Sequence, residues 1–442
     1  MLRKIRIAAA AFFFVLTTLL FLDFTGTLHA WFGWMAKIQF LPALLALNVG
    51  VVAFLVILTL LFGRVYCSVI CPLGVMQDIV SWASGKRRKH RNRFAYSPAL
   101  TWLRRGMLVV FVAAMLAGVG SLLAPYSAYG RIASNLLAPV YAWGNNLLAY
   151  IAGRMDSYAF YSVDVWMKSL STLLVAVVTF AVLFVLAWRS GRTYCNTICP
   201  VGTVLGFLAR YSLFKPRFDT SKCNGCKLCA RNCKASCIDP AAHKIDYSRC
   251  VACMDCLENC RQGAITYTLR RRKPDPAPAP QRPAADAAKT PSDASRRRFL
   301  GLAGIVAYSA LRAQEKKVDG GLAVIVDKKI PNRATPVVPP GAQSLRHFNA
   351  HCTGCQLCVS VCPNQVLRPS GKLMTLMQPE MSFERGYCRP ECTKCAEVCP
   401  TGAIRLTDLA GKSSIQIGHA VWIAENCEVN TDGVSCNNCA RH

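Results

Sequence analysis

The chain has 442 residues, 24 of them cysteine, and a formal net charge of +29. This length indicates several domains. The cysteines recur as C-x2-C-x2-C-x3-C, a spacing typical of iron–sulfur ligands, so we do not expect the disulfide framework of a small secreted domain. The basic runs 86–91 and 270–273 lie beside apolar segments and in a linker. Such runs are typical of the cytoplasmic side of a membrane protein, so binding to nucleic acid is not expected.

Four apolar stretches are long enough to cross a hydrocarbon core, which takes about 20 residues. They are 5–24, 40–62, 107–123 and 170–188. The loop 63–105 is rich in Lys and Arg and is expected on the cytoplasmic side, whereas the weakly charged loops 25–39 and 124–169 are expected outside. Aromatic residues of the outer loops favour an interfacial belt or a short re-entrant helix, with a quinone pocket as the alternative. No histidine lies inside a span, so a haem held by two histidines is unsupported.

The motif G-R-x-Y-C-x-x-I-C-P-x-G occurs twice, at 63–74 and 191–202, each time after a long apolar run. The repeat unit is therefore two membrane helices that end in a pair of thiols. Residues i and i+4 share a helix face, so each motif is expected to present its two cysteines together, and the following proline to end or bend the helix. These four thiols are Cys67, Cys71, Cys195 and Cys199.

A pseudo-two-fold arrangement of the repeats would bring the four thiols together. Four thiolates can hold a [4Fe–4S] cluster or a soft metal ion. Dithiol redox chemistry and plain structural thiols are the alternatives. Arg64 and Arg192 are expected to offset the negative charge of such a site, although the distribution of basic residues toward the cytoplasm explains them equally.

Two complete ferredoxin runs follow the second motif. In such two-cluster folds the fourth cysteine of each run ligates the other cluster. The proline that normally follows it is replaced by Lys234 and Arg261. Cys237 is a ninth thiol and is interpreted as a buried small residue. Zinc is the second choice of metal, but structural zinc sites do not use this interleaved spacing. One [4Fe–4S] cluster is assigned to Cys223, Cys226, Cys229 and Cys260, and the other to Cys250, Cys253, Cys256 and Cys233.

Residues 271–294 are rich in Pro and Ala, which predicts an extended linker. The stretch S-R-R-R-F-L-G at 295–301 resembles a twin-arginine export signal. The apolar segment 299–311 has about the length of a signal h-region and is short for a span. Ala307-Tyr308-Ser309 is a poor cleavage site, so we expect a retained signal anchor over 295–312. Export in the folded state suits a domain whose clusters are assembled inside the cell. A basic stop beside an interfacial helix is the alternative.

The remaining cysteines predict an exported polyferredoxin. They are Cys352, Cys355, Cys358, Cys362, then Cys388, Cys392, Cys395, Cys399, and finally Cys427, Cys436 and Cys439. The last run requires a cysteine after His442, so we expect the sequence to be truncated inside a cluster motif. Cys362 then completes the cluster begun by Cys388 or serves an absent run, and nested pairing would assign Cys399 to the last set.

Residues 1–270 resemble the NapH-type membrane ferredoxins, with four spans, two C-x3-C-P motifs and two cytoplasmic clusters. Residues 295–442 resemble the NapG-type exported polyferredoxins, so the chain resembles a fusion of the two. The resemblance implies a multi-pass protein of the bacterial inner membrane, with its first ferredoxin domain cytoplasmic and its C-terminal domain periplasmic. It also implies a quinol dehydrogenase component that takes electrons from quinol and passes them to a periplasmic reductase or cytochrome.

We therefore expect an α-helical membrane domain with four spans and a two-fold repeat, plus α+β ferredoxin-like 4Fe-4S domains. The expected boundaries are 1–214, 215–270, 271–294, 295–312 and 313–442. The expected cofactors are two cytoplasmic and several exported [4Fe–4S] clusters, with quinol as substrate and no acid–base catalytic residues. Two other classes stay open: reduction or delivery of copper for oxidase assembly, and redox sensing without turnover.

Overall fold

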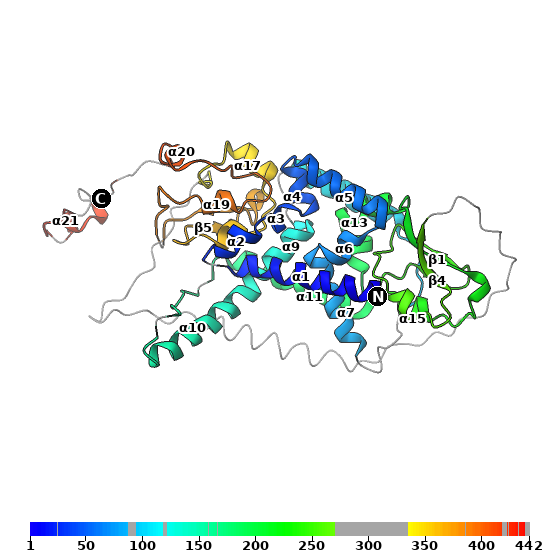
Figure 1. Cartoon of the computed structure of the whole chain (residues 1–442). Helices are drawn as coiled ribbons and strands as arrows, with labels where there is room; N and C mark the ends of the chain where they lie inside the picture. The colour runs from blue at the N-terminus through cyan, green and yellow to red at the C-terminus, as the bar shows by residue number, and fades with distance from the viewer. Residues whose placement is uncertain are drawn as a thin grey trace, which may run out of the picture. The chain divides into compact units, whose positions relative to one another are not determined.

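The computed structural model of the chain describes residues 1–23, 25–86, 94–117, 122–157, 159–165, 167–269, 335–384, 386–417, 422, 424–431 and 433–437. The expected linker and the twin-arginine-like segment lie outside these residues, as does Cys439. The described residues up to 269 and from 335 onward belong to one unit, and a continuous hydrophobic core includes residues of both parts, up to Ile417 (Figure 1).

The first half of the chain is helical. Its elements are α1 (Leu2–Leu22), α2 (Thr27–Phe32), α3 (Trp34–Lys37), α4 (Phe40–Leu45), α5 (Val49–Phe62), α6 (Val65–Val69), α7 (Pro72–Gly85), α8 (Thr101–Leu116), α9 (Pro125–Ile132), the π-helical turn η3 (Ala133–Leu137), α10 (Ala138–Arg154), α11 (Leu170–Ser190), α12 (Thr193–Thr197) and α13 (Pro200–Ala209). Among the described residues, α1 and α11 are long and apolar enough to cross a membrane. A helix of 21 residues is about 31 Å long, close to the thickness of a hydrocarbon core.

The expected second span, 40–62, is not one helix. It divides into α4 and α5 at Leu47, whose φ is +52°. Asn48 caps α5, because its side chain accepts a hydrogen bond from the backbone N–H of Val51 at 3.2 Å. The third stretch forms α8, which ends at Leu116, and residues 118–121 are not described. Four crossings therefore stay a prediction.

The segment 124–169 is more ordered than the expected outer loop. Pro125 occupies the first turn of α9, where its missing N–H costs nothing. All residues of α9 are buried, and the helix packs against α7 and α11. In contrast, α10 buries none of its residues, and Trp143 is 62% exposed. The segment thus contains one core helix and one exposed apolar helix.

The repeated motif folds the same way in both copies. A glycine with positive φ, Gly63 or Gly191, ends the long helix. The first cysteine then lies in a short helix, α6 or α12, and the second lies in extended backbone at the N-cap of α7 or α13. We expected the two cysteines of a motif to be i, i+4 neighbours on one helix. This prediction is wrong, because the short helix ends before the second cysteine. The proline begins the next helix rather than ending the previous one, since it occupies its first turn.

The first ferredoxin domain consists of β1 (Phe214–Phe218), the 3-10 turn η4 (Thr220–Lys222), α14 (Leu228–Arg231), β2 (Ile238–Asp239), β3 (Lys244–Ile245), α15 (Asp255–Asn259) and β4 (Ile265–Leu269). Strands β1 and β4 pair antiparallel with Phe214 opposite Leu269, and β2 pairs with β3. The Tyr267 hydroxyl donates to the carbonyl of Phe62 at 2.9 Å. This bond joins the sheet to the end of α5.

The C-terminal domain consists of α17 (Leu345–His351), α18 (Leu357–Ser360), β5 (Leu367–Pro369), the 3-10 turn η6 (Leu373–Thr375), β6 (Pro379–Met381), α19 (Lys394–Glu397), α20 (Leu409–Ser413), the 3-10 turn η7 (Ala424–Asn426) and α21 (Glu428–Thr431). Strands β5 and β6 pair antiparallel. The two ferredoxin domains contact α1 at opposite ends. Arg3 pairs with Asp255 at 2.9 Å, and Lys394 donates to the carbonyl of Thr25 at 3.0 Å (Figure 1).

Candidate functional site

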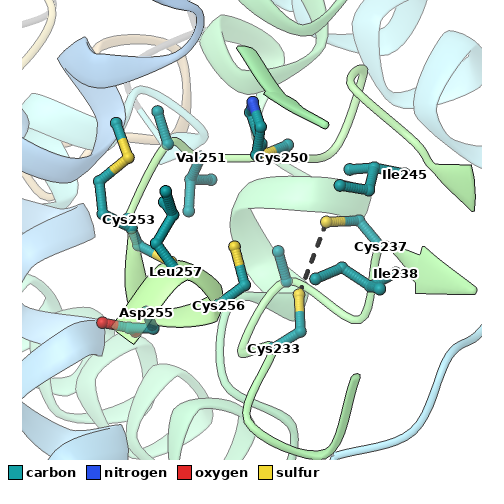
Figure 2. A pocket seen from close by; sticks show the side chains of 14 residues that line it. Cys233, Cys237, Ile238, Ile245, Cys250, Val251, Cys253, Asp255, Cys256 and Leu257 are labelled. Carbon is teal, nitrogen blue, oxygen red and sulfur yellow. Dashed lines mark hydrogen bonds between the residues drawn. The ribbon is translucent and has the colours of Figure 1, made fainter. Parts of the chain in front are cut away.

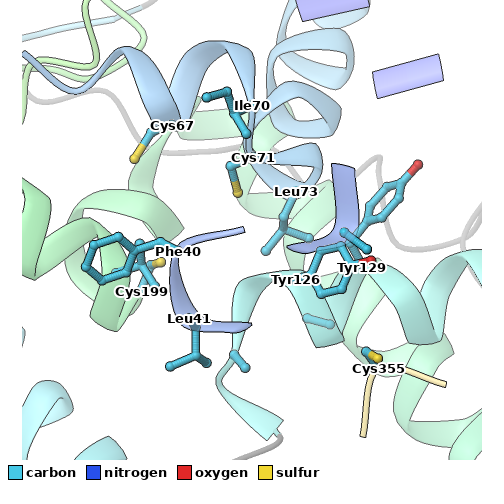
Figure 3. Packing of buried hydrophobic residues seen from close by; sticks show 14 of the residues in the cluster. Phe40, Leu41, Cys67, Ile70, Cys71, Leu73, Tyr126, Tyr129, Cys199 and Cys355 are labelled. Carbon is cyan, nitrogen blue, oxygen red and sulfur yellow. The ribbon is translucent and has the colours of Figure 1, made fainter. Parts of the chain in front are cut away.

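The four motif thiols converge in the core. Cys67, Cys71, Cys195 and Cys199 are each at most 6% exposed. Cys199 lies within electrostatic reach of the other three, and Cys71 lies within reach of Cys67 and Cys195. Figure 3 shows the side chains of Cys67, Cys71 and Cys199 around one space between the helices. The two-fold repeat therefore brings its thiols together although neither pair shares a helix.

Each motif sends its arginine into the other motif. Arg64 and Arg192 are fully buried, and each donates to the carbonyl oxygen of the first cysteine of the opposite copy, at 3.1 and 2.6 Å. The last glycine of each motif provides the room. A Cβ on Gly74 would lie 2.8 Å from a terminal nitrogen of Arg192, and one on Gly202 would lie 2.8 Å from a terminal nitrogen of Arg64.

Hydrogen-bond donors surround the sulfurs. Gln77 Nε2 lies 3.3 Å from Cys195 Sγ. Nε of Arg64 and Nη2 of Arg192 are buried and have no hydrogen-bond partner within the described part of the chain. Burial raises the pKa of the Cys71 thiol to about 12, so a bound group must displace protons from the thiols. Donors and buried cations around four thiols fit an anionic thiolate centre such as a [4Fe–4S] cluster.

The two copies differ in how their arginines are neutralised. Arg192 pairs with Asp78 at 2.7 Å, whereas the position equivalent to Asp78 in the second copy is Gly206. Arg64 forms no ion pair with any described residue, and it donates to Asn196 Oδ1 at 2.8 Å. A buried guanidinium without a counter-ion is costly. An anionic centre on the four thiols would supply that counter-ion.

Lys234, which stands where ferredoxin runs normally have proline, joins the ferredoxin domain to the thiol-bearing helices. Its ammonium bridges Asp78 of α7 at 3.0 Å and Asp255 of α15 at 3.1 Å. Burial alone would raise the pKa of Asp78, but Arg192 and Lys234 lower it well below its usual range. A proline could make neither bond, so the departure from the usual run has a structural cause.

The first ferredoxin domain contains two cavities lined by cysteines. Each combines three cysteines of one run with the fourth of the other, which is the interleaving expected for a two-cluster fold. Across the described residues, no three Cys, His, Asp or Glu side chains approach one another as a single metal ion requires. One cavity is lined by Cys233, Cys250, Cys253 and Cys256 (Figure 2), and the other by Cys223, Cys226, Cys229 and Cys260.

Cys237 lines the first of these cavities. It is 2% exposed, and its Sγ lies 3.6 Å from Cys233 Sγ (Figure 2). Hydrogen bonding from Cys237 lowers the pKa of the Cys233 thiol. The ninth thiol is thus buried, as expected, but it also contacts the sulfur of an assigned ligand, which its sequence position did not indicate.

The cysteines of the C-terminal domain also form interleaved groups. Cys399 lies near the first three cysteines, and Cys362 lies near Cys388 and Cys395. Cys399 therefore lies with the first set. It does not lie with the last set, to which the nested pairing would have assigned it. Of that last set, Cys427 is half-buried and Cys436 exposed. The first group is Cys352, Cys355, Cys358 and Cys399, and the second is Cys362, Cys388, Cys392 and Cys395.

The sequence did not reveal the buried residues of α9. Tyr126, Tyr129 and Arg131 are 2%, 1% and 0% exposed. They lie in the segment that was expected to form an outer loop, and they are close to Cys355 of the C-terminal domain. The available signal was Pro125 at a helix start, followed by two tyrosines at the i, i+3 spacing of one helix face.

Two protein families match parts of the chain. One, described as a 4Fe-4S binding domain, matches residues 44–90 and 172–221. The other, described as a 4Fe-4S dicluster domain, matches residues 351–403. The first family thus covers both copies of the repeated motif, and the second covers the two interleaved groups of the C-terminal domain. No solved structure matches the chain.

Similar proteins come from archaea and bacteria. An uncharacterized protein of Methanocaldococcus jannaschii is 25% identical over 48% of this chain and 68% of its own length. The methylamine utilization ferredoxin-type protein MauM of Methylophilus methylotrophus is 32% identical over 26% of this chain and 53% of its own length. The ferredoxin-type protein NapH of Escherichia coli is 29% identical over 44% of this chain and 55% of its own length. The chain thus spans about half the length of MauM and NapH.

The chain is an iron–sulfur, ferredoxin-type electron-transfer protein. Its segments of the 4Fe-4S type and its similarity to NapH and MauM support the resemblance to polyferredoxins. The fusion with a NapG-type partner stays a prediction.

Proposed function

We propose that this chain is a membrane-bound electron relay in which the four motif thiols hold a [4Fe–4S] cluster between two ferredoxin domains. One observation carries the proposal. The thiols are buried together beside the cation of Arg64, which has no carboxylate partner among the described residues, and they lie in the segments that match a 4Fe-4S binding family. Such clusters, when bound, accept and release single electrons.

The contacts of α1 support a relay between two faces of a membrane. Arg3 at its start contacts the first ferredoxin domain, and Thr25 just beyond its end contacts the C-terminal domain. The helix between them has the length of a hydrocarbon core. The basic loop 63–105 then favours a cytoplasmic first domain and a periplasmic C-terminal domain.

By the resemblance to NapH-type ferredoxins, we take membrane quinol as the electron source and a periplasmic reductase or cytochrome as the acceptor. A second source is favoured by the surface of the first domain. Cys226 is exposed, and so are the nearby Lys227 and Arg231. A basic surface beside an exposed ligand suits an acidic soluble electron carrier on the cytoplasmic side.

Metal analysis tests the central assignment. The four motif cysteines are changed together to serine, and iron and sulfide are measured per chain after anaerobic purification. We expect the loss of about four iron and four sulfide per chain, since one [4Fe–4S] cluster is removed. The control is Ser68→Ala, which changes a fully buried residue of the first motif and removes no thiol. Unchanged iron would reject the cluster, and bound copper in the wild-type chain would favour the copper-handling alternative.

Anaerobic reduction distinguishes the two electron sources. A menaquinol analogue or a reduced soluble ferredoxin is added to the detergent-solubilised chain, and the clusters are followed by visible absorbance and EPR. We expect the quinol to reduce the clusters, and we expect a quinol-site inhibitor to block this reduction. If only the ferredoxin reduces the clusters, the quinol assignment is wrong and the cytoplasmic carrier replaces it.

A further inference from the structure

Helix α9 lies between the motif thiols and the C-terminal domain. On one side, Arg131 is an electrostatic neighbour of Tyr194, which adjoins Cys199 and Cys195. On the other side, Arg131 is a neighbour of Cys355. Figure 3 shows Tyr126 and Tyr129 in the region between the motif cysteines and Cys355.

Backbone packing holds Cys355 closely against α9. A Cβ on Gly130 would lie 2.4 Å from the carbonyl oxygen of Cys355 and 2.8 Å from the ring of Phe21. No side chain fits at position 130 without moving one of these neighbours. The close approach therefore depends on glycine at this position.

Polar contacts around α9 continue the same surface. Asn135, one turn beyond Arg131, donates to Gln356 Oε1 at 2.9 Å. Lys168, just before α11, donates to the carbonyl of Val359 at 3.3 Å. Both partners belong to the stretch around α18, between the first and fourth cysteines of the first C-terminal run.

The groups that face Cys355 fit an anionic centre on the C-terminal cysteines. The Tyr126 hydroxyl is buried beside Cys355 and has no hydrogen-bond partner among the described residues. The Arg131 guanidinium donates to the carbonyl of Leu122 at 3.0 Å and is fully buried. A buried cation between two sets of thiolates stabilises negative charge on both.

We propose that α9 is the electron-transfer junction of this chain, with Gly130, Tyr126 and Arg131 forming the surface that seats Cys355 against the helical body. One electron leaves the centre on the motif thiols, which is oxidised by one electron, and the centre on Cys352, Cys355, Cys358 and Cys399 is reduced by one. No bond breaks and no proton moves. The electron-transfer part rests on the proposed function of the motif thiols, and the docking part does not.

Photo-crosslinking tests the docking part in the full chain. A photoreactive residue replaces Asn135, and the crosslinked peptides are identified by mass spectrometry. We expect crosslinks to the peptide around Gln356, and their loss in Gly130→Val. Gly144→Val is the matched control, since a Cβ on Gly144 of α10 meets nothing within 4 Å. Absence of the crosslink in the otherwise native chain would overturn the docking surface.

Rapid-freeze EPR tests the electron transfer. The chain is reduced by one equivalent of a fast donor to its first ferredoxin domain, and the C-terminal signal is assigned with Cys352→Ser. In wild type and Gly144→Val we expect the electron to reach the C-terminal centre. In Gly130→Val we expect the first-domain signals to form normally while the C-terminal centre stays oxidised. Equal C-terminal reduction in both glycine variants would overturn the junction.

A milder variant guards against misfolding. Asn135→Ala combined with Lys168→Ala removes three side-chain hydrogen bonds of two half-buried residues, and slower C-terminal reduction with unchanged iron content is expected. Unchanged reduction in this variant counts against the junction. If the motif-serine variant keeps its iron while the Asn135 crosslink still forms, the proposed function fails and the docking surface stands.

Discussion

Lys234 and Arg64 show how single residues connect the parts of this chain. Lys234 replaces a proline of the usual ferredoxin run and bridges carboxylates of the two domains it joins. Arg64 places an unneutralised cation beside the motif thiols. Both side chains are buried. Because a buried charge without a partner is costly, the presence or absence of an ion pair has a large effect on stability at these positions.

Restoring the usual residue at position 234 will weaken the contact between the first ferredoxin domain and the helices. We expect Lys234→Pro to destabilise this contact by about 3 kcal/mol, because buried carboxylates lose a partner. Arg261→Pro, the equivalent change in the second run, is the control, since Arg261 is exposed. Limited proteolysis of the residues 215–269 measures the effect. Equal cleavage of the two variants would contradict this role of Lys234.

At the scale of elements, the break between the two cysteines of each motif is decisive. The short helices α6 and α12 end before the second cysteine, and the following proline starts a new helix. The turn aims both thiols of a motif inward and leaves room for the arginine of the other motif. Glycine is required where that arginine passes, and this requirement comes from packing and not from backbone strain.

Two glycines of α7 will respond differently to alanine. A Cβ on Gly74 would lie 2.2 Å from the carbonyl oxygen of Cys67, whereas one on Gly85 meets nothing within 4 Å. We expect Gly74→Ala to destabilise the chain by about 1–3 kcal/mol through overpacking. Gly85→Ala should be neutral or slightly stabilising, since alanine favours helix. Thermal unfolding in detergent compares them, and the same melting temperature for both would refute the packing argument.

At the scale of the whole molecule, the helical body carries a ferredoxin domain at each end of α1. The first domain is attached by charge pairs that cross the contact, Lys234 with Asp78 and Asp255 with Arg3. The C-terminal domain is attached mainly by backbone packing on α9 and by neutral or single-charge hydrogen bonds. The two attachments should therefore respond differently to pH.

Acidification will loosen the first domain selectively. Burial raises the pKa of Asp255, but Lys234 and Arg3 together lower it, so its folded pKa lies below the usual value. A depressed pKa contributes stability that is full above the unfolded value, about 4, and is lost as pH falls through the folded value. Hydrogen exchange of residues 215–269 should therefore differ between wild type and Asp255→Asn at neutral pH, and the difference should begin to shrink as pH falls below about 4. A constant difference would disprove the assignment.

The sequence predicted those features that depend on spacing. The regular runs indicated the interleaved cysteine groups, and the duplicated motif indicated converging thiols. Features that depend on tertiary contacts could not be predicted from the sequence. No local sequence pattern indicates that Arg64 reaches Cys195, that Lys234 bridges two domains, or that α9 is buried. The sequence analysis also missed the division of α4 from α5. Apolar residues lie on both sides of Leu47 and Asn48, and only the backbone turn at Leu47 and the cap at Asn48 separate the two helices.

The exchange of arginines between the motifs has a consequence for biogenesis. The arginine that donates to the carbonyl of each first cysteine comes from the other copy, so the first motif stays incomplete while the ribosome is still making the second, more than a hundred residues later. A cluster inserted early would meet two thiols and no cation from the partner copy. Maturation of the central site should therefore follow completion of both halves, and a chain cut between them should need its two fragments in the same membrane before iron is retained.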